Sequence, residues 1–109
     1  MKLVVCIVTD KDAHNLLEQL VKEGYRATKL ASTGGFLKEG NTTMLIGVED
    51  EQVDNLVEII GETCEVRKQL FTPISPLPGP AEAYIPYSVE VSVGGAIVFV
   101  LDVEKYFKV

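Results

Sequence analysis

The sequence predicts a single α+β domain in which a strand–helix–strand unit is used twice, and three observations support this. The chain has 109 residues, which fits one domain and leaves little room for two. Apolar runs of strand length alternate with segments whose apolar residues recur at helical spacing. The halves also resemble each other: aligning Asp10 with Asp50 brings Asn15 onto Asn55 and Glu18 onto Glu58.

The first unit begins with a buried strand, predicted over residues 2–8 (KLVVCIV) from their continuous apolar run. Asp10 is suited to cap the helix that follows, and Gly24 is suited to end it. Residues 25–32 (YRATKLAS) return as a strand. The apolar residues of the helix share one face: Ala13, Leu16, Leu17, Leu20 and Val21.

The second unit repeats this order, with a strand at 42–48 (TTMLIGV) and a helix that we expect Asp50 to open. Residues 89–101 read as one long strand interrupted at 94–95 (GG), where a bulge or a close backbone approach is expected. Two such units predict a ferredoxin-like fold, an antiparallel sheet with both helices on one face. The apolar residues of the second helix are Val53, Leu56, Val57 and Ile60.

The second face of this sheet also needs a cover. Strands 2–8 and 42–48 are apolar at both odd and even positions, whereas a solvated face would show alternation. The predicted elements include no further helix for that face. We therefore expect an oligomer in which the sheets of neighbouring subunits face one another.

The composition narrows the function classes. The chain is 47% hydrophobic and 24% charged, which is typical of a globular protein. No apolar run approaches the roughly 20 residues of a membrane helix, and the start is too short and polar for a signal peptide, so we expect a cytoplasmic location. The net charge of −6 argues against a nucleic-acid polymer as partner, although a small anion needs only a local cation.

Catalytic and metal-binding patterns are not found in the sequence. Cys6 lies in an apolar run, Cys64 follows a helix, and His14 is the only histidine. These residues give no disulfide framework, no metal-ligand spacing and no Ser-His or Cys-His set. We therefore predict a protein that is not an enzyme and has no metal or cofactor.

Two loops separate the predicted strands. The first is the short glycine turn at 33–40. The second, at 71–87, contains all five prolines, which disfavour both a helix interior and a regular strand ladder. A loop of this length in a small domain is either functional or mobile.

The glycine turn offers groups suited to an adenine nucleotide. Arg26 and Thr28 are two apart on a strand and share a face, where a guanidinium and a hydroxyl suit phosphate oxygens. The glycines at 34–35 let backbone N–H groups approach a ligand. Phe36 offers a face for base stacking, and the Asn41 amide can pair with an adenine edge.

Each of these groups also has a purely structural explanation. A glycine pair is a common hairpin device, and Arg26 can serve as a surface ion-pair partner. Thr28 is a good strand former, and Phe36 can fill the core of a neighbouring subunit. Asn41 tolerates the left-handed conformation at a turn exit.

Two longer stretches, RATKLASTGGFLKEGNTT (26–43) and IPYSVEVSVGGAIVFV (85–100), carry a family resemblance. They resemble the cyclic di-AMP receptor family of PII-like signal-transduction proteins, and the similarity runs from residue 1 to about residue 105. The resemblance implies a ferredoxin-like homotrimer that binds cyclic di-AMP at clefts between subunits. It also implies that residues 33–40 and 71–87 are the two loops by which this family differs from nitrogen-regulatory PII proteins.

The resemblance assigns roles to individual residues. Arg26 and Thr28 would contact phosphate, Asn41 would read an adenine, and Gly47 would make room for the ligand. The last residues, 106–109 (YFKV), receive no role from it. The other positions that the resemblance places at the ligand are Ala27, Gly35, Phe36, Leu37, Gly94 and Phe99.

The resulting hypothesis is a non-enzymatic second-messenger receptor in which cyclic di-AMP changes loop conformation and regulates an unidentified partner protein. The first alternative is a PII-like sensor of ATP or ADP, although a triphosphate asks for more cations than Arg26, Lys29 and Lys38 supply. A trimeric metal-tolerance protein lacks the expected ligands. A dinucleotide hydrolase lacks a paired acid and base.

Overall fold

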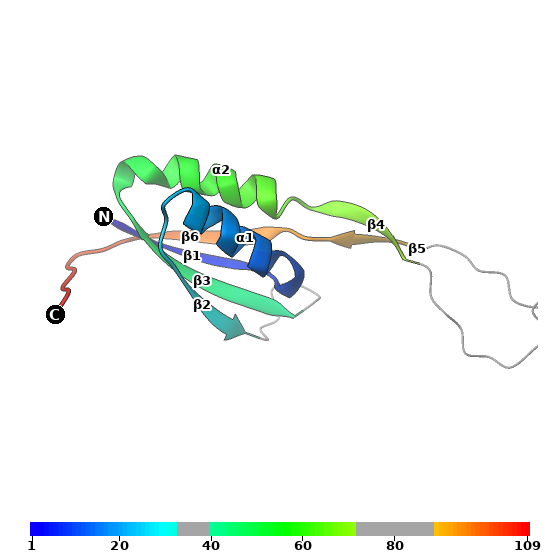
Figure 1. Cartoon of the computed structure of the whole chain (residues 1–109), viewed down its shortest axis with the longest axis horizontal. Helices are drawn as coiled ribbons and strands as arrows, with labels where there is room; N and C mark the ends of the chain where they lie inside the picture. The colour runs from blue at the N-terminus through cyan, green and yellow to red at the C-terminus, as the bar shows by residue number, and fades with distance from the viewer. Residues whose placement is uncertain (33–39, 72–88) are drawn as a thin grey trace, which may run out of the picture.

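The computed structural model describes residues 1–32, 40–71 and 89–109, which form a four-stranded antiparallel sheet, two helices on one of its faces, and a separate two-stranded arm (Figure 1). The strand order β2-β3-β1-β6 fits the predicted ferredoxin-like fold. The main elements are β1 (Lys2–Thr9), α1 (Asp10–Lys22), β2 (Ala27–Ser32), β3 (Asn41–Val48), α2 (Val53–Thr63) and β6 (Ala96–Asp102).

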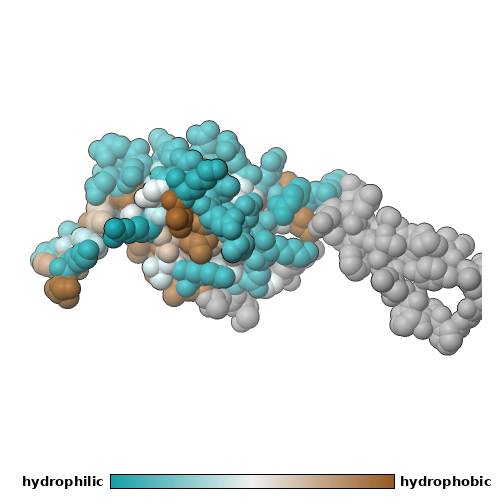
Figure 2. All heavy atoms as spheres, in the orientation of Figure 1, coloured by the Kyte–Doolittle hydropathy of each residue, from teal (hydrophilic) through white to brown (hydrophobic). Residues whose placement is uncertain are grey.

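The core lies between the sheet and the helices. Alternate residues of β1 (Val4, Cys6 and Val8) point to the helix side and are fully buried. They pack with helix residues at the predicted spacing: Leu16, Leu20, Leu56 and Ile60. Figure 2 shows mainly hydrophilic residues over the outward side of α2, so each helix buries one face and leaves the other to solvent.

The first predicted helix cap is wrong by one residue. Thr9 is the N-cap of α1, because it is the last residue with extended backbone, and Asp10 is already helical. The Asp10 carboxylate instead accepts a hydrogen bond from the Thr42 hydroxyl at 2.5 Å, which ties the start of α1 to β3. The predicted helix end is confirmed, since Gly24 adopts a φ of 87° just after α1.

The second helix also begins differently from the prediction. A 3-10 turn, η1 (Asp50–Gln52), precedes α2, and Glu49 rather than Asp50 is its N-cap. The Gln52 side-chain oxygen accepts a hydrogen bond from the Glu49 N–H at 2.9 Å, and the Glu49 side chain bonds the Gln52 backbone in return. This reciprocal capping box satisfies two backbone donors, which a cap at Asp50 would leave to water.

The predicted strand over 89–101 is two strands in two different sheets. β5 (Val89–Val93) pairs with β4 (Arg67–Phe71) in the arm, whereas β6 pairs with β1. The interruption at 94–95 is confirmed: Gly94 and Gly95 have φ values of 90° and 96°. The chain therefore changes partners there instead of forming a bulge within one ladder. β4 was not predicted.

The second face of the four-stranded sheet, called the open face from here on, is apolar as predicted. Leu30, Phe99 and Leu101 are 45%, 45% and 49% exposed. They share this face with Leu3, Val5 and Leu45, which are half-buried. Both helices lie on the opposite side (Figure 1). The expected oligomer remains a prediction.

Candidate ligand-binding site

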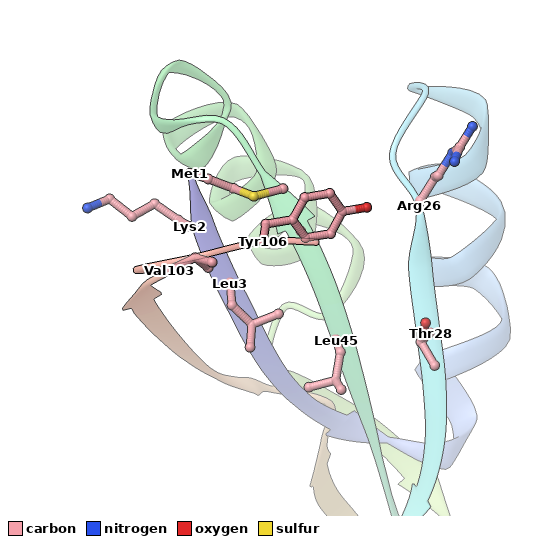
Figure 3. Close-up of a pocket in the computed structure, with 9 residues that line it drawn as sticks. Met1, Lys2, Leu3, Arg26, Thr28, Leu45, Val103 and Tyr106 are labelled. Carbon is pink, nitrogen blue, oxygen red and sulfur yellow. The ribbon is translucent and has the colours of Figure 1, made fainter. Parts of the chain in front are cut away.

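A hollow of about 330 Å³ lies on the open face, at the end of the sheet where β1 begins and β3 ends (Figure 3). Leu3 and Leu45 give it an apolar floor, and Arg26 and Thr28 provide polar groups on the β2 side. Gly47 also lines it. Three residues that the sequence predicted for a ligand, Arg26, Thr28 and Gly47, thus meet in one place.

Strand register explains this convergence. Thr28 pairs with Leu45 across β2 and β3, and Gly47 pairs with Leu3 across β3 and β1. Side chains two residues apart on a strand share a face, which places Arg26, one residue before β2, beside Thr28. The two-residue period in the sequence therefore predicted their common face correctly.

The charges around the hollow leave Arg26 available to an anion. Among the residues that the structure describes, none forms a hydrogen bond or an ion pair with its guanidinium. Lys2, which also lines the hollow, is hydrogen-bonded to the Asp102 carboxylate. That bond raises the pKa of Lys2 and lowers the pKa of Asp102. A guanidinium and a hydroxyl on the same side of the hollow, from Arg26 and Thr28, are suited to bind a phosphate group.

Gly47 keeps the hollow open. A Cβ placed on Gly47 would meet the Met1 Cε atom at 3.8 Å, an ordinary contact distance. The fold itself therefore tolerates a side chain at this position. What a larger residue would remove is space inside the hollow.

Two further predicted residues share the open face but lie away from the hollow. Asn41 and Gly47 occupy opposite ends of β3, about 20 Å apart at roughly 3.4 Å per residue. The Asn41 side chain is buried opposite Thr9. Phe99 is exposed on β6, opposite Val5. One subunit does not bring all the predicted residues together.

The remaining predicted residues are placed as follows. The Ala27 side chain packs against the core, so only its backbone faces the site. Gly94 lies between β5 and β6, next to Arg67. Gly35, Phe36 and Leu37 fall outside the described residues, as do most of the two predicted loops.

Gly94 belongs to a second polar cluster, at the root of the arm. The Arg67 guanidinium is 2.8 Å from the buried Asp12 carboxylate, which also accepts a hydrogen bond from the Thr9 hydroxyl at 3.2 Å. The Gly95 N–H donates to the Cys64 carbonyl at 2.5 Å. This cluster joins α1, the end of α2 and the arm, and its charges are matched within the chain.

The described part of the chain contains no group of three or more His, Cys, Asp or Glu residues that could hold a metal ion. His14 is exposed and lies 3.0 Å from Glu18. Burial raises the pKa of the Cys6 thiol to about 11 and that of Cys64 to about 12, so both stay protonated at neutral pH and are poor nucleophiles. In the same described part, no helix is long and apolar enough to cross a membrane.

Sequence reasoning missed one residue of the hollow that carries recognisable chemistry. Tyr106, in the segment after β6, lines it together with Val103. The aromatic pair at 106–107 was visible in the sequence. Its position was not, because it depends on the path of the chain beyond the last strand.

Comparison with known proteins agrees with this reading of the fold. A crystal structure of a functionally unknown protein from Pediococcus pentosaceus ATCC 25745 is 42% identical to this chain, with a TM-score of 0.81. The match covers 99% of this chain and 96% of that one. The profile of the cyclic-di-AMP receptor family matches residues 1–109, the whole chain. The chain therefore belongs to the cyclic-di-AMP receptor family.

Proposed function

We propose that the protein is a non-enzymatic, PII-like cytoplasmic receptor that binds cyclic di-AMP at the hollow of the open face. The observation that carries this proposal is the meeting of Arg26, Thr28 and Gly47 around one hollow. An apolar floor with polar groups on one side is typical of small-molecule sites, in which a few polar groups fix the orientation of the ligand.

The phosphate and the base have separate places in this arrangement. A ligand phosphate binds Arg26 and the Thr28 hydroxyl, because the guanidinium has no competing partner among the described residues. An adenine ring lies against Leu3 and Leu45, whose apolar side chains are only partly buried in the isolated subunit. Gly47 leaves the space that the ring requires.

The size of the hollow argues for a site shared between subunits. Its volume of about 330 Å³ is near the lower end of the usual range for ligand pockets, roughly 300–1,000 Å³. A cyclic dinucleotide has two adenosines and two phosphates, and one such hollow holds only part of it. A neighbouring subunit that covers the exposed Phe99 and Leu101 would supply the rest. We propose that this assembly is the homotrimer implied by the family resemblance.

Signalling then requires that the ligand favour one conformation over another. We propose that binding changes the conformation of the two loops that extend from this framework and so regulates contact with a partner protein. A ligand can shift such an equilibrium only by its difference in affinity for the two states.

Isothermal titration calorimetry tests the proposal, with cyclic di-AMP, cyclic di-GMP and ATP titrated into the same sample and the assembly state followed by sedimentation. Saturable binding of cyclic di-AMP alone, at one ligand per subunit of a trimer, is the expected result. Preferential binding of ATP would instead favour the PII-like sensor of ATP or ADP. Absence of cyclic di-AMP binding would overturn the proposal.

A pair of variants, one just before β2 and one within it, sharpens this experiment. Arg26→Ala should weaken cyclic di-AMP binding at least tenfold and reduce its salt dependence, because a phosphate contact is lost. Lys29→Ala removes the same charge three residues further along the chain, but from the helix side of the sheet. Equal weakening by both variants would mean that overall charge, and not a site at Arg26, determines binding.

A further inference from the structure

The segment after β6 crosses the rim of the hollow. The Val103 N–H donates to the Met1 carbonyl at 3.3 Å, which extends the contact between β6 and β1 beyond the end of the ladder. Val103 and Tyr106 then both line the hollow. This backbone contact anchors the start of the segment that carries Tyr106 next to β1.

The Tyr106 ring is placed where a ligand would meet it. Its side chain is among the exposed large hydrophobic groups, at 65% exposure, although it lies over a concave site. Figure 3 shows the ring beside Met1, with its hydroxyl on the side turned toward Arg26. An exposed aromatic ring next to an apolar floor and an arginine offers a planar heterocycle a stacking surface and its phosphate a cation.

We infer that Tyr106 is a ligand-binding residue, whose ring stacks on a base of the nucleotide held by Arg26 and Thr28. This inference rests on the proposed function and extends it to a residue to which the family resemblance gave no role. Stacking uses the flat face that every base presents, so it adds affinity for any nucleotide. Selectivity for adenine must come from polar contacts elsewhere in the site.

The neighbouring aromatic residue provides a matched control. Phe107 is 77% exposed and adjacent in sequence, but only Tyr106 lines the hollow. Removing either ring deletes a similar exposed surface, so effects on folding or on nonspecific adhesion should be alike. An effect on ligand binding should be confined to Tyr106.

The absence of tryptophan from the sequence allows a direct test. In Tyr106→Trp the new indole is the only one in the chain, and cyclic di-AMP should quench its fluorescence with the dissociation constant measured by calorimetry. Phe107→Trp should show little change on the same titration. Calorimetry on Tyr106→Ala should give about tenfold weaker binding or more, and Tyr106→Phe should stay within about threefold of the unmodified protein, because the ring is retained.

The outcomes separate this inference from the proposed function. If the unmodified protein binds cyclic di-AMP but Tyr106→Ala binds it equally well or more tightly, the stacking role is overturned and the receptor proposal stands. Equal quenching in both tryptophan variants would also overturn it, since a general change of the segment would then be the cause. No binding of cyclic di-AMP by the unmodified protein would overturn both.

Discussion

Each end of the four-stranded sheet has an arginine near a glycine, but the surroundings of the two pairs differ. At the arm root, Arg67 is ion-paired with the buried Asp12, and Gly94 is packed against both side chains. At the other end, Arg26 lines the hollow without a described partner, and a Cβ on Gly47 would make only an ordinary contact, with Met1 at 3.8 Å. The comparison teaches that residue type alone does not identify a site: an arginine whose charge is matched internally stabilises the fold, whereas an unmatched one is available to a ligand.

The glycines should give the largest contrast in stability. Gly94→Ala should lower the free energy of unfolding by about 2–4 kcal/mol, because its φ of 90° is strained for alanine and the new Cβ would lie 2.6 Å from the Glu65 carbonyl oxygen. Gly47→Ala should change it by no more than about 0.5 kcal/mol. Urea unfolding followed by circular dichroism measures both.

Gly24→Ala is the matched control for the backbone contribution. Gly24 also has a positive φ, 87°, but a Cβ there would meet nothing within 4 Å. Gly24→Ala should lower the free energy of unfolding by about 1 kcal/mol, which measures the conformational strain without a steric clash. If Gly94→Ala were no more destabilising than Gly24→Ala, the close packing of Gly94 against the Glu65 carbonyl would be contradicted.

The arginines should separate stability from binding. Arg67→Ala leaves the Asp12 carboxylate buried without its ion-pair partner and should lower the free energy of unfolding by about 2 kcal/mol. We expect less than the loss for a fully buried pair because the Arg67 side chain is about half exposed. Arg26→Ala should leave stability within about 0.5 kcal/mol and act on ligand affinity instead.

A double-mutant cycle checks the cause of the Arg67 effect. Asp12→Asn, Arg67→Ala and the combined variant should show a coupling energy of about 1 kcal/mol or more, because the pair interacts directly. Additive losses would indicate that Arg67 acts through packing. A large loss of stability in Arg26→Ala would contradict the distinction between a structural Arg67 and a ligand-binding Arg26.

Alkaline pH should lower stability gradually, through the two buried thiols Cys6 and Cys64. A thiol in the unfolded chain titrates near pH 8.5. Burial raises the pKa of Cys6 to about 11 and of Cys64 to about 12. The stability that each buried thiol contributes is therefore complete below about pH 8.5 and is lost as the pH rises from there toward the raised pKa. Each thiol should reduce the free energy of unfolding by about 1 kcal/mol per pH unit there.

Thermal unfolding between pH 7 and 10 measures this dependence. Cys64 is adjacent to the arm root, since its carbonyl accepts the Gly95 N–H, and Cys64→Ala should remove about half of the slope. An unchanged slope in that variant would assign the alkaline loss to other groups.

Much of the four-stranded framework could be predicted from local patterns. The spacing of Leu16 and Leu20 fixed the buried face of α1, and the period of two placed Arg26 beside Thr28. The arm could not be predicted in this way. The segment Arg67–Phe71 has no extended apolar run. Residues 89–93 alternate and residues 96–101 are continuously apolar, but both patterns are strand-like and neither identifies the strand with which each part pairs.

The site was predictable to the same extent. Arg26 and Thr28 share a face by alternation along one strand, and the separation of Asn41 from Gly47 follows from their spacing within β3. That Thr28 and Gly47 line one hollow follows only from the register of β2 with β3 and of β3 with β1. Tyr106 was beyond reach because no repeating pattern governs a segment without secondary structure. Long-range placement, and not residue chemistry, was the missing information.

The pairing of Phe71 with Val89 has a practical consequence for protein engineering. It places residues 71 and 89, which flank the segment 72–88, side by side at the end of the arm, away from the four-stranded sheet (Figure 1). Because the closure cost of a loop rises by only about 0.6 kcal/mol for each doubling of its length, a peptide of another length can replace this segment without disturbing the strand register. The arm is thus a natural point at which to graft an affinity epitope or a fluorescent reporter.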